Sequence, residues 1–236
     1  MLRIEKLNSY YGTSHVLHNL SIMIKEGQGV ALIGRNGAGK SSTMKSIMGL
    51  MPRVDGDITF AENPINKEKT HKRVRMGIGY VPEDRRIYKD LTVEENITIA
   101  ANAIKKVRKP LELNEVWENF PLLKDLRKRK GSELSGGEQQ ILSIARSVVG
   151  RPKLILLDEP TEGIAPIIVQ NLKEVIKNMI DQMEVAVLLA EQNIKFTIDL
   201  TDYVYVIDNG QIVYSGSSEE FKNREDLHHK FLGVSS

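Results

Sequence analysis

A glycine-rich segment near the start of the chain has the composition of a phosphate-binding loop. Residues 34–41 read Gly-Arg-Asn-Gly-Ala-Gly-Lys-Ser, after an apolar run and before a segment with helical spacing. Glycines let backbone N–H groups turn inward around phosphate oxygens, and the N-terminus of the following helix adds a partial positive charge. Lys40 would contact the β and γ phosphates of a nucleotide and the Ser41 hydroxyl would bind Mg²⁺, whereas an empty strand-to-helix turn would need neither. The residues expected to contact the nucleotide are Gly34, Arg35, Asn36, Gly37, Ala38, Gly39, Lys40, Ser41 and Ser42.

Two adjacent carboxylates follow an apolar segment later in the chain. Residues 154–157 read Leu-Ile-Leu-Leu, and Asp158 and Glu159 come directly after them. Successive residues of a strand point to opposite sides, so the two carboxylates should have different roles. We expect Asp158 to bind Mg²⁺ and Glu159 to act as the general base for an attacking water. The alternative is that both side chains merely begin a loop and cap the next helix.

A second glycine motif lies between these two segments, where residues 134–140 read Leu-Ser-Gly-Gly-Glu-Gln-Gln. Ser135 with Glu138 three residues later fits a capping box, so an ordinary helix start is the simplest interpretation. That interpretation does not explain the glycine pair, because glycine in a first helical turn costs about 1 kcal/mol relative to alanine. Bare backbone allows close approach, so Ser135, Gly136 and Gly137 predict a second anion site at a helix N-terminus.

Polar residues also follow two further short apolar segments. Residues 78–82 lead to Glu83, and residues 185–190 lead to Glu191 and Gln192. The C-terminal ends of parallel strands meet at one sheet edge, where nucleotides bind in open α/β folds. We therefore expect Glu83, Gln192 and the two carboxylates to cluster there. For Glu83 two interpretations stay equally open: a side chain that senses Mg²⁺ or the attacking water, and a solvated loop residue.

An aromatic pair lies near the phosphate loop in the sequence, in the segment Tyr10-Tyr11-Gly12 between two N-terminal strands. An aromatic ring at this position could stack on a nucleotide base. The stretch alone favours the alternative, an aromatic residue packed at a strand end on the surface.

The elements that must position these side chains follow from apolar periodicity. Short strands and helices alternate along the chain, separated by turn residues. The expected strands are residues 2–7, 16–17, 20–24, 30–33, 57–60, 78–82, 154–159, 185–190, 203–208 and 211–214. The expected helices are 41–50, 67–76 and 167–183, with a further helix after Ser135 and a helical tail at the end of the chain. Residues 91–129 lose the strand pattern and are interpreted as a helical insertion. The fold class is therefore α/β, with a mainly parallel sheet and an antiparallel N-terminal part.

Composition narrows the class of protein. The chain has 236 residues, of which 41% are apolar, so it can bury a sizeable core. A formal charge of +2 does not indicate a nucleic-acid partner, and the basic runs at residues 105–109 and 124–130 lack interleaved aromatics that would stack on bases. The absence of cysteine suits a reducing compartment. No apolar run reaches the roughly 18 residues that span a bilayer, so other chains would supply any spanning part.

Taken together, residues 34–41, 134–140 and 154–159 resemble, in order and spacing, the nucleotide-binding subunits of ATP-binding cassette (ABC) transporters. The resemblance extends over essentially the whole chain. It implies a single ABC ATPase domain over residues 1–236, with a P-loop NTPase core and antiparallel β subdomain at 1–83 and 150–236 and a helical subdomain at 84–149.

The resemblance also implies ligands and partners. ATP and Mg²⁺ would be bound, and a second ABC ATPase subunit would form a head-to-tail dimer. In such a dimer the phosphate loop of one subunit and residues 135–137 of the other sandwich each ATP. Tyr11 matches the base-stacking aromatic of the family, which reverses the preference stated above. Permease subunits and, indirectly, a periplasmic or extracellular substrate-binding protein would complete an assembly on the cytoplasmic side of the membrane, without nucleic acid.

Three departures from the family pattern are informative. Glu83 replaces the usual Gln and is included among the expected Mg²⁺ ligands, Gln192 replaces the usual His, and residues 162–165 lack the usual Asp. Gln192 can donate a hydrogen bond to the γ-phosphate but cannot carry a proton as His can. Residues 80–86, 161–166 and 190–193 look like the second ATPase of branched-chain amino-acid importers. Importers of urea or short-chain amides share much of this pattern.

Two other classes of function stay open. One is a cassette ATPase that remodels nucleic acid or ribosomes, although the long coiled-coil insertions, zinc-binding cysteines or duplicated cassettes of those proteins are missing from this sequence. The other is a regulator that binds ATP without useful hydrolysis, which Gln192 and Ala165 keep under consideration. By resemblance alone, the permease contact is expected at the helical insertion together with Glu83, Arg85 and Arg86.

Overall fold

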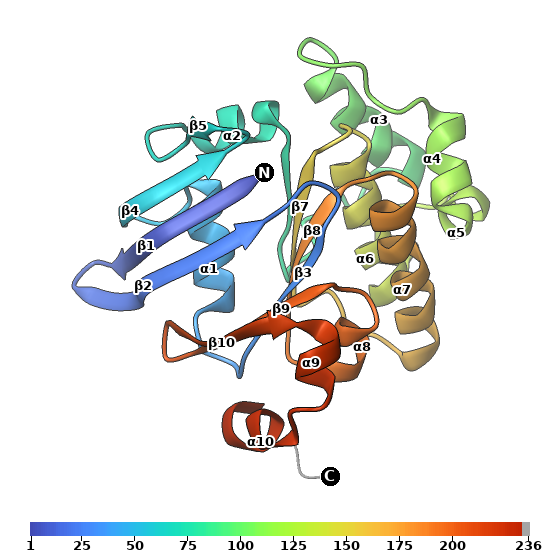
Figure 1. The fold of residues 1–236 in the computed structure, drawn as a ribbon. Coiled ribbons are helices and arrows are strands. Elements are labelled where there is room, and N and C mark those ends of the chain that lie inside the picture. The colour runs from blue at the N-terminus through green and yellow to red at the C-terminus, as the bar shows by residue number, and fades with distance from the viewer. Residues whose placement is uncertain (233–236) are drawn as a thin grey trace.

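The computed structural model describes residues 1–232 and contains a six-stranded, mostly parallel sheet (Figure 1). The strand order is β10-β9-β3-β8-β7-β6, and all neighbouring pairs are parallel except β9 and β10. The strands are β3 (Gly29–Ile33), β6 (Ile78–Val81), β7 (Leu154–Asp158), β8 (Ala186–Glu191), β9 (Tyr203–Asp208) and β10 (Gln211–Ser217). The predicted α/β class with a mainly parallel sheet is confirmed.

A separate antiparallel sheet is built from the N-terminal part of the chain, in the order β2-β1-β4-β5. Its strands are β1 (Leu2–Tyr11), β2 (Ser14–Ile24), β4 (Arg53–Phe60) and β5 (Asn63–Pro64). The first two strands are longer than predicted. Register shifts interrupt their pairing after Ile4, and Lys6 and Asn19 both have a φ of 50°. Such bulges break the alternation of apolar and polar residues, which made continuous strands look like shorter pieces.

The parallel sheet has a hydrophobic core on each face. Helix α1 (Lys40–Met48) and the antiparallel sheet cover one face, and α6 (Gly136–Val148) and α7 (Pro166–Asp181) cover the other (Figure 1). Alternate residues of β7 divide between the two cores: Leu156 packs on the α1 side and Ile155 on the α6 side. Burial on both faces explains why β7 and β8 are continuous apolar runs.

The predicted helical insertion lies between β6 and β7. It consists of α3 (Val93–Ile104), α4 (Leu113–Asn119), α5 (Pro121–Asp125), the short η1 (Gly131–Glu133) and α6. The remaining helices are α2 (Thr70–Met76), α8 (Ile194–Ile198), α9 (Ser218–Lys222), α10 (Glu225–Leu227) and η2 (His228–Leu232). We propose the same division as before, with residues 84–149 as a helical subdomain, while residues 233–236 of the expected core lie outside the described residues. None of the helices within residues 1–232 is both long and apolar enough to cross a membrane.

Arg73 of α2 fixes the far end of α1. Its side chain is only 3% exposed, and Nη1 donates to the carbonyls of Ser46 at 3.0 Å and Ile47 at 2.7 Å. Nε and Nη2 donate to the carbonyls of Glu68 and Asn66. The last carbonyls of a helix have no partners within the helix, and here the Gly49 amide reaches the Ser46 carbonyl at 3.1 Å. The buried guanidinium adds donors for the Ile47, Glu68 and Asn66 carbonyls, which would otherwise be costly to bury.

We expect Arg73→Ala to lower the free energy of unfolding by about 3 kcal/mol, because it leaves buried carbonyls unpaired and opens a cavity. Chemical denaturation measures the change. Arg73→Lys keeps the charge but not the fork of donors, so its loss should be intermediate, and an Arg73→Ala variant as stable as wild type would contradict this role.

Candidate nucleotide site

The phosphate loop lies between the C-terminal end of β3 and the N-terminus of α1. Gly37 and Gly39 have φ values of 80° and 116°, which L side chains rarely adopt, so the loop path depends on glycine. The loop is supported from a distant part of the chain, because the Gly210 amide in the β9–β10 turn donates to the Ala38 carbonyl at 2.8 Å. Ser42 follows in the first turn of α1.

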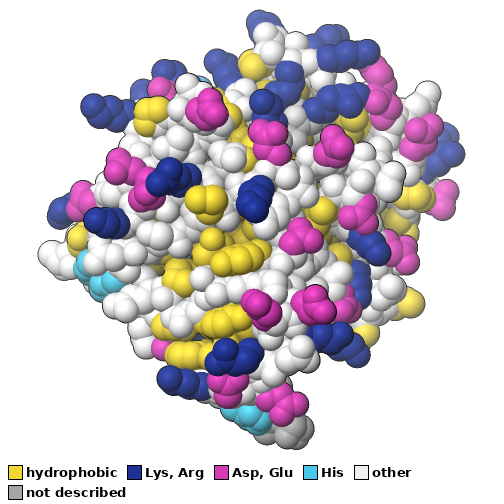
Figure 2. Space-filling view, in the orientation of Figure 1, with side chains coloured by type: hydrophobic (Ala, Val, Ile, Leu, Met, Phe, Trp, Pro, Cys, Tyr) yellow, Lys and Arg dark blue, Asp and Glu magenta, His cyan; other side chains and the backbone are white. Residues whose placement is uncertain are grey.

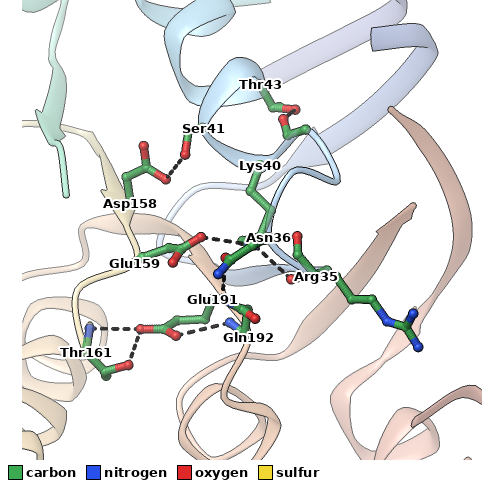
Figure 3. Close-up of polar contacts among 12 residues, drawn as sticks. Arg35, Asn36, Lys40, Ser41, Thr43, Asp158, Glu159, Thr161, Glu191 and Gln192 are labelled. Carbon is green, nitrogen blue, oxygen red and sulfur yellow. Dashed lines mark hydrogen bonds and ion pairs between the residues drawn. The ribbon is translucent and has the colours of Figure 1, made fainter. Parts of the chain in front are cut away.

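Lys40 is held at the centre of the site by three acceptors (Figure 3). Its Nζ donates to the carbonyls of Gly34 at 2.8 Å and Arg35 at 3.0 Å. The same ammonium forms an ion pair with Oε1 of Glu159 at 3.0 Å, and the two side chains are only 2% and 10% exposed. The three protons of this ammonium therefore all have acceptors within the chain.

Asp158 is buried at the end of β7 and is held by two hydroxyl groups. Ser41 Oγ donates to Oδ1 at 2.9 Å, and Tyr80 Oη donates to Oδ2 at 3.2 Å. Burial raises the pKa of Asp158 from 3.8 to about 6, and the two hydrogen bonds oppose this shift. Tyr80 was not recognised from the sequence, because nothing in a strand pattern shows which neighbouring strand a hydroxyl will reach.

This pKa shift predicts an effect of Asp158→Asn on stability. Because the folded-state pKa of about 6 lies above the ordinary 3.8, the folded protein binds the proton more tightly than the unfolded chain. The contribution of Asp158 to stability is therefore present at low pH and is lost as pH rises through about 6. The substitution should raise the free energy of unfolding at pH 8 by on the order of 2 kcal/mol, with little gain near pH 4.

Denaturation at several pH values, without Mg²⁺ or nucleotide, measures this difference. Asp125→Asn, on the surface of the helical segment, is the matched control and should not change stability with the same pH dependence. A variant no more stable than wild type at pH 8 would contradict the prediction.

Glu159 and Asp158 point in different directions, as predicted, but for a different reason. Strand β7 ends at Asp158, and Glu159 lies beyond it with a φ of 45°. The reversal is therefore made by a left-handed backbone conformation and not by the pleat of a strand. It directs the Glu159 carboxylate toward Lys40, while Asp158 faces Ser41 (Figure 3).

The end of β8 contributes two side chains. Gln192 Nε2 donates to Oδ1 of Asn36 in the phosphate loop. Glu191, expected to follow the strand, is its last residue and is only 3% exposed. Its carboxylate accepts hydrogen bonds from Thr161, and burial raises the pKa of Glu191 while those bonds lower it. The sequence analysis singled out Gln192 at this strand end and not Glu191, and it gave no sign of the partner of Glu191, which follows a different strand.

Two expected site residues lie at the surface of the molecule. Tyr11 ends β1 with 42% of its side chain exposed, whereas neighbouring Tyr10 is stacked on His15 with ring centroids 4.3 Å apart. Tyr11 is therefore the ring of the pair that a ligand can reach. Glu83 is also exposed, and its charge contributes to raising the pKa of Asp158.

Ser135, Gly136 and Gly137 start α6 and are not joined to the phosphate loop by any hydrogen bond or ion pair among residues 1–232. The predicted capping box is present, with the Ser135 amide donating to Oε2 of Glu138 at 2.7 Å. Packing within the chain also requires glycine at position 137, which the sequence did not reveal. A Cβ there would lie 2.3 Å from Cγ2 of Ile168 on α7. Ser135 itself is exposed.

The residues at this sheet edge fit a nucleotide with Mg²⁺. The α1 N-terminus has no side-chain cap within the described residues, so its partial positive charge and Lys40 suit phosphate oxygens. Ser41 and Asp158 offer oxygen ligands side by side, which is the donor type that Mg²⁺ prefers together with substrate phosphates.

Comparison with known proteins defines the class of this molecule. The family model described as ABC transporter matches residues 17–162. Among solved structures, a nucleotide-free ATP-binding cassette from an ABC transporter is 27% identical, with a TM-score of 0.80 over 96% of this chain and 95% of that one. An ABC transporter cassette in its ADP conformation is 29% identical, with a TM-score of 0.79 over 94% of this chain and 93% of that one.

Curated relatives are similar in sequence to this chain over nearly their full length. BraG of Pseudomonas aeruginosa, a high-affinity branched-chain amino acid transport ATP-binding protein, is 36% identical over 99% of this chain and 100% of its own. LptB of Escherichia coli K12, a lipopolysaccharide export system ATP-binding protein, is 32% identical over 98% of this chain and 97% of its own. The chain belongs to the ABC transporter family, and it is an ATP-hydrolysing subunit of a transporter.

Proposed function

We propose that this chain is the ATPase of an importer for branched-chain or other hydrophobic amino acids. The observation that carries the proposal is the end-to-end similarity to BraG. A protein from Archaeoglobus fulgidus named as a probable branched-chain amino acid transport ATP-binding protein, LivF, is 32% identical over 99% of both chains and supports it. The chain would act peripherally on the cytoplasmic side of the membrane, together with permease subunits and a substrate-binding protein.

The geometry supports a role for each side chain in ATP hydrolysis. Lys40 would contact the β and γ phosphates, while Ser41 and Asp158, with Glu83 close by, would hold Mg²⁺. Glu159 would act as the general base for water, and Gln192 would donate a hydrogen bond to the γ-phosphate. Tyr11 would stack on the adenine, and the loop from Gly34 to Ser42 would surround the phosphates.

Dimer formation would complete the site. The exposed Ser135 with Gly136 and Gly137 would close over the phosphates bound by a second cassette, because a helix N-terminus favours anions. No hydrogen bond or ion pair within residues 1–232 joins these residues to the phosphate loop of the same chain, which is compatible with an arrangement in which each ATP is shared between two subunits.

Uptake measurements test the cargo. Deleting the gene should abolish uptake of labelled leucine, and the wild-type chain, but not Glu159→Gln, should restore it.

Lipopolysaccharide export is the second candidate, favoured by the 32% identity to LptB. Urea or short-chain amide import is the third. Copurified membrane complexes distinguish them, since only a leucine-loaded binding protein should stimulate ATP hydrolysis by an amino-acid importer.

A basic cleft supports the placement of the permease contact. It has a volume of about 570 Å³ between α2, β6, α3 and α6, and its lining includes Arg75, Arg85, Arg86, Arg108 and Arg146. Figure 2 shows Lys and Arg side chains distributed over the visible face of the molecule, among Asp and Glu side chains. The cleft differs from this scattered charge because it brings several arginines together in a hollow. A permease segment with acidic side chains would fit it.

We expect the double substitution Arg85→Glu with Arg86→Glu to lower uptake by about tenfold or more, while ATP hydrolysis by the isolated chain stays within about twofold. Uptake and ATPase assays on the same variant measure the two effects. Arg3→Glu, on the antiparallel sheet, is the control and should leave both unchanged. Unaffected uptake in the double variant would contradict the placement.

A further inference from the structure

The turn that carries Glu159 has an unfavourable backbone conformation. Glu159 has a φ of 45°, which residues other than glycine rarely adopt. Such a conformation persists only where its surroundings hold it in place, and it occurs preferentially at functional sites. Contacts with neighbouring parts of the chain must therefore hold the segment from Glu159 to Thr161 in place.

Strand β8 holds both ends of this turn. At the first end, the Glu159 amide donates to the Ala190 carbonyl at 2.9 Å. At the other end, Oε1 of Glu191 accepts from the Thr161 amide at 2.9 Å and from Thr161 Oγ1 at 2.6 Å. The first contact needs only a backbone carbonyl, whereas the second depends on the side chain of Glu191 (Figure 3).

The same carboxylate also contacts the residue that faces the phosphate loop. Oε2 of Glu191 accepts from the Gln192 amide at 3.1 Å, and Gln192 in turn donates to Asn36. A buried carboxylate is unfavourable unless its oxygens are paired, and the partners of this one include the backbone amides of Thr161 and Gln192 and the Thr161 hydroxyl. Its acceptor capacity, which an amide side chain has only in part, is what these donors require.

We propose that Glu191 is a positioning residue for ATP hydrolysis: by binding Thr161 and the Gln192 backbone together, it holds Glu159 in the conformation that directs its carboxylate into the site. The proposal rests on the proposed function of Glu159 as the base. The Glu191 carboxylate contacts Gln192 only at its backbone amide, and within residues 1–232 it forms no hydrogen bond or ion pair with Lys40 or Ser41. Its effect is therefore on the position of Glu159 and not on nucleotide binding.

Steady-state kinetics with a purified chain test the proposal. Glu191→Gln places a donor group against the Thr161 donors and should lower kcat by about 10²-fold, since small displacements of a reacting group have effects of that size. The KM for ATP and the affinity for a fluorescent ATP analogue should stay within about twofold, because Lys40 and Ser41 are held by other contacts.

Substitutions at Thr161 address the same contact without altering the buried carboxylate. Thr161→Val should lower kcat about tenfold, and Thr161→Ser, which keeps the hydroxyl, should retain wild-type activity. Thr201→Val is the control: it removes the hydroxyl of a different threonine, a buried one that donates to the Thr197 carbonyl at 3.0 Å, and should leave kcat unchanged.

A double-mutant cycle with Glu159→Gln separates positioning from a general structural role. In single-turnover assays, Glu191→Gln should cause no further loss once Glu159 has been replaced, because there is no base left to position. Additive losses, a raised KM with unchanged kcat, or wild-type kcat in both Glu191→Gln and Thr161→Val would overturn the proposal. Wild-type turnover by Glu159→Gln alone would instead refute the assignment of the base, so the two failures are distinguishable.

Discussion

Glu159→Gln is expected to lower ATP turnover by about 10³-fold while ATP binds at least as tightly as to the wild type. General-base catalysis contributes roughly 10²–10⁴-fold, and the amide of glutamine cannot accept the proton of the attacking water. The substitution also removes the ion pair in which Lys40 and Glu159 lie 3.0 Å apart. Lys40 then meets the phosphates without first losing a charged partner, which favours binding.

Two measurements on one preparation check this result: steady-state phosphate release and equilibrium binding of a fluorescent ATP analogue. Glu162→Gln is the matched control, because Glu162 is an exposed carboxylate three residues further along. The nearby Glu159 charge raises the pKa of Glu162, but Glu162 forms no ion pair with Lys40 among the described residues. The control should keep most of its activity, and wild-type-like hydrolysis by Glu159→Gln would refute the base assignment.

Mixing two inactive variants is expected to restore ATP hydrolysis. Lys40→Ala removes the phosphate contact of a subunit's own loop, and Ser135→Arg blocks the surface it offers to the partner's ATP. Each variant alone should lose more than about 10²-fold in turnover. In a mixed head-to-tail dimer both defects fall in one site and the other site is intact. Because random pairing makes about half of the dimers mixed, and each of these has one working site of two, an equal mixture should recover about a quarter of wild-type activity.

The control for complementation is a mixture of Lys40→Ala with Glu159→Gln. Both substitutions affect the half-site that a subunit builds around its own phosphate loop, so every site in the mixed dimer stays defective. Wild-type hydrolysis that rises more steeply than protein concentration establishes that the chain pairs with itself under the assay conditions. Recovery in the control mixture, or none with the Ser135→Arg partner, would contradict the shared site.

Much of the fold could be predicted because local patterns and tertiary structure agree. Buried parallel strands are continuous apolar runs, and the residues after β6, β7 and β8 share one edge because of the sheet order. Strand lengths in the antiparallel sheet could not be predicted, because bulges at residues such as Lys6 interrupt the alternation. Nothing in a local pattern specifies where a strand of this kind resumes its register.

In the candidate site, too, some residues could be predicted from the sequence and others could not. Residues whose chemistry requires a fixed spacing, such as Lys40 with Ser41, could be singled out from the sequence, and their roles stay predictions. The partners of Asp158 and Glu191 could not, because Tyr80 lies on the neighbouring strand β6 and Thr161 lies in the turn after the neighbouring strand β7, and such contacts depend on how the strands are paired. The packing of Ile168 on Gly137 could not be predicted either, because it depends on how α7 packs against α6.

The strand order has a consequence for how the molecule is made. β3, which leads into the phosphate loop, lies between β8 and β9, and the loop is further supported by Gly210. All of these partners are synthesised more than half a chain length after β3. Strand β3, at the centre of the sheet, therefore cannot pair with β8 and β9 until nearly the whole polypeptide has left the ribosome. Pairings so distant in sequence form slowly and leave apolar surface open to aggregation in the meantime.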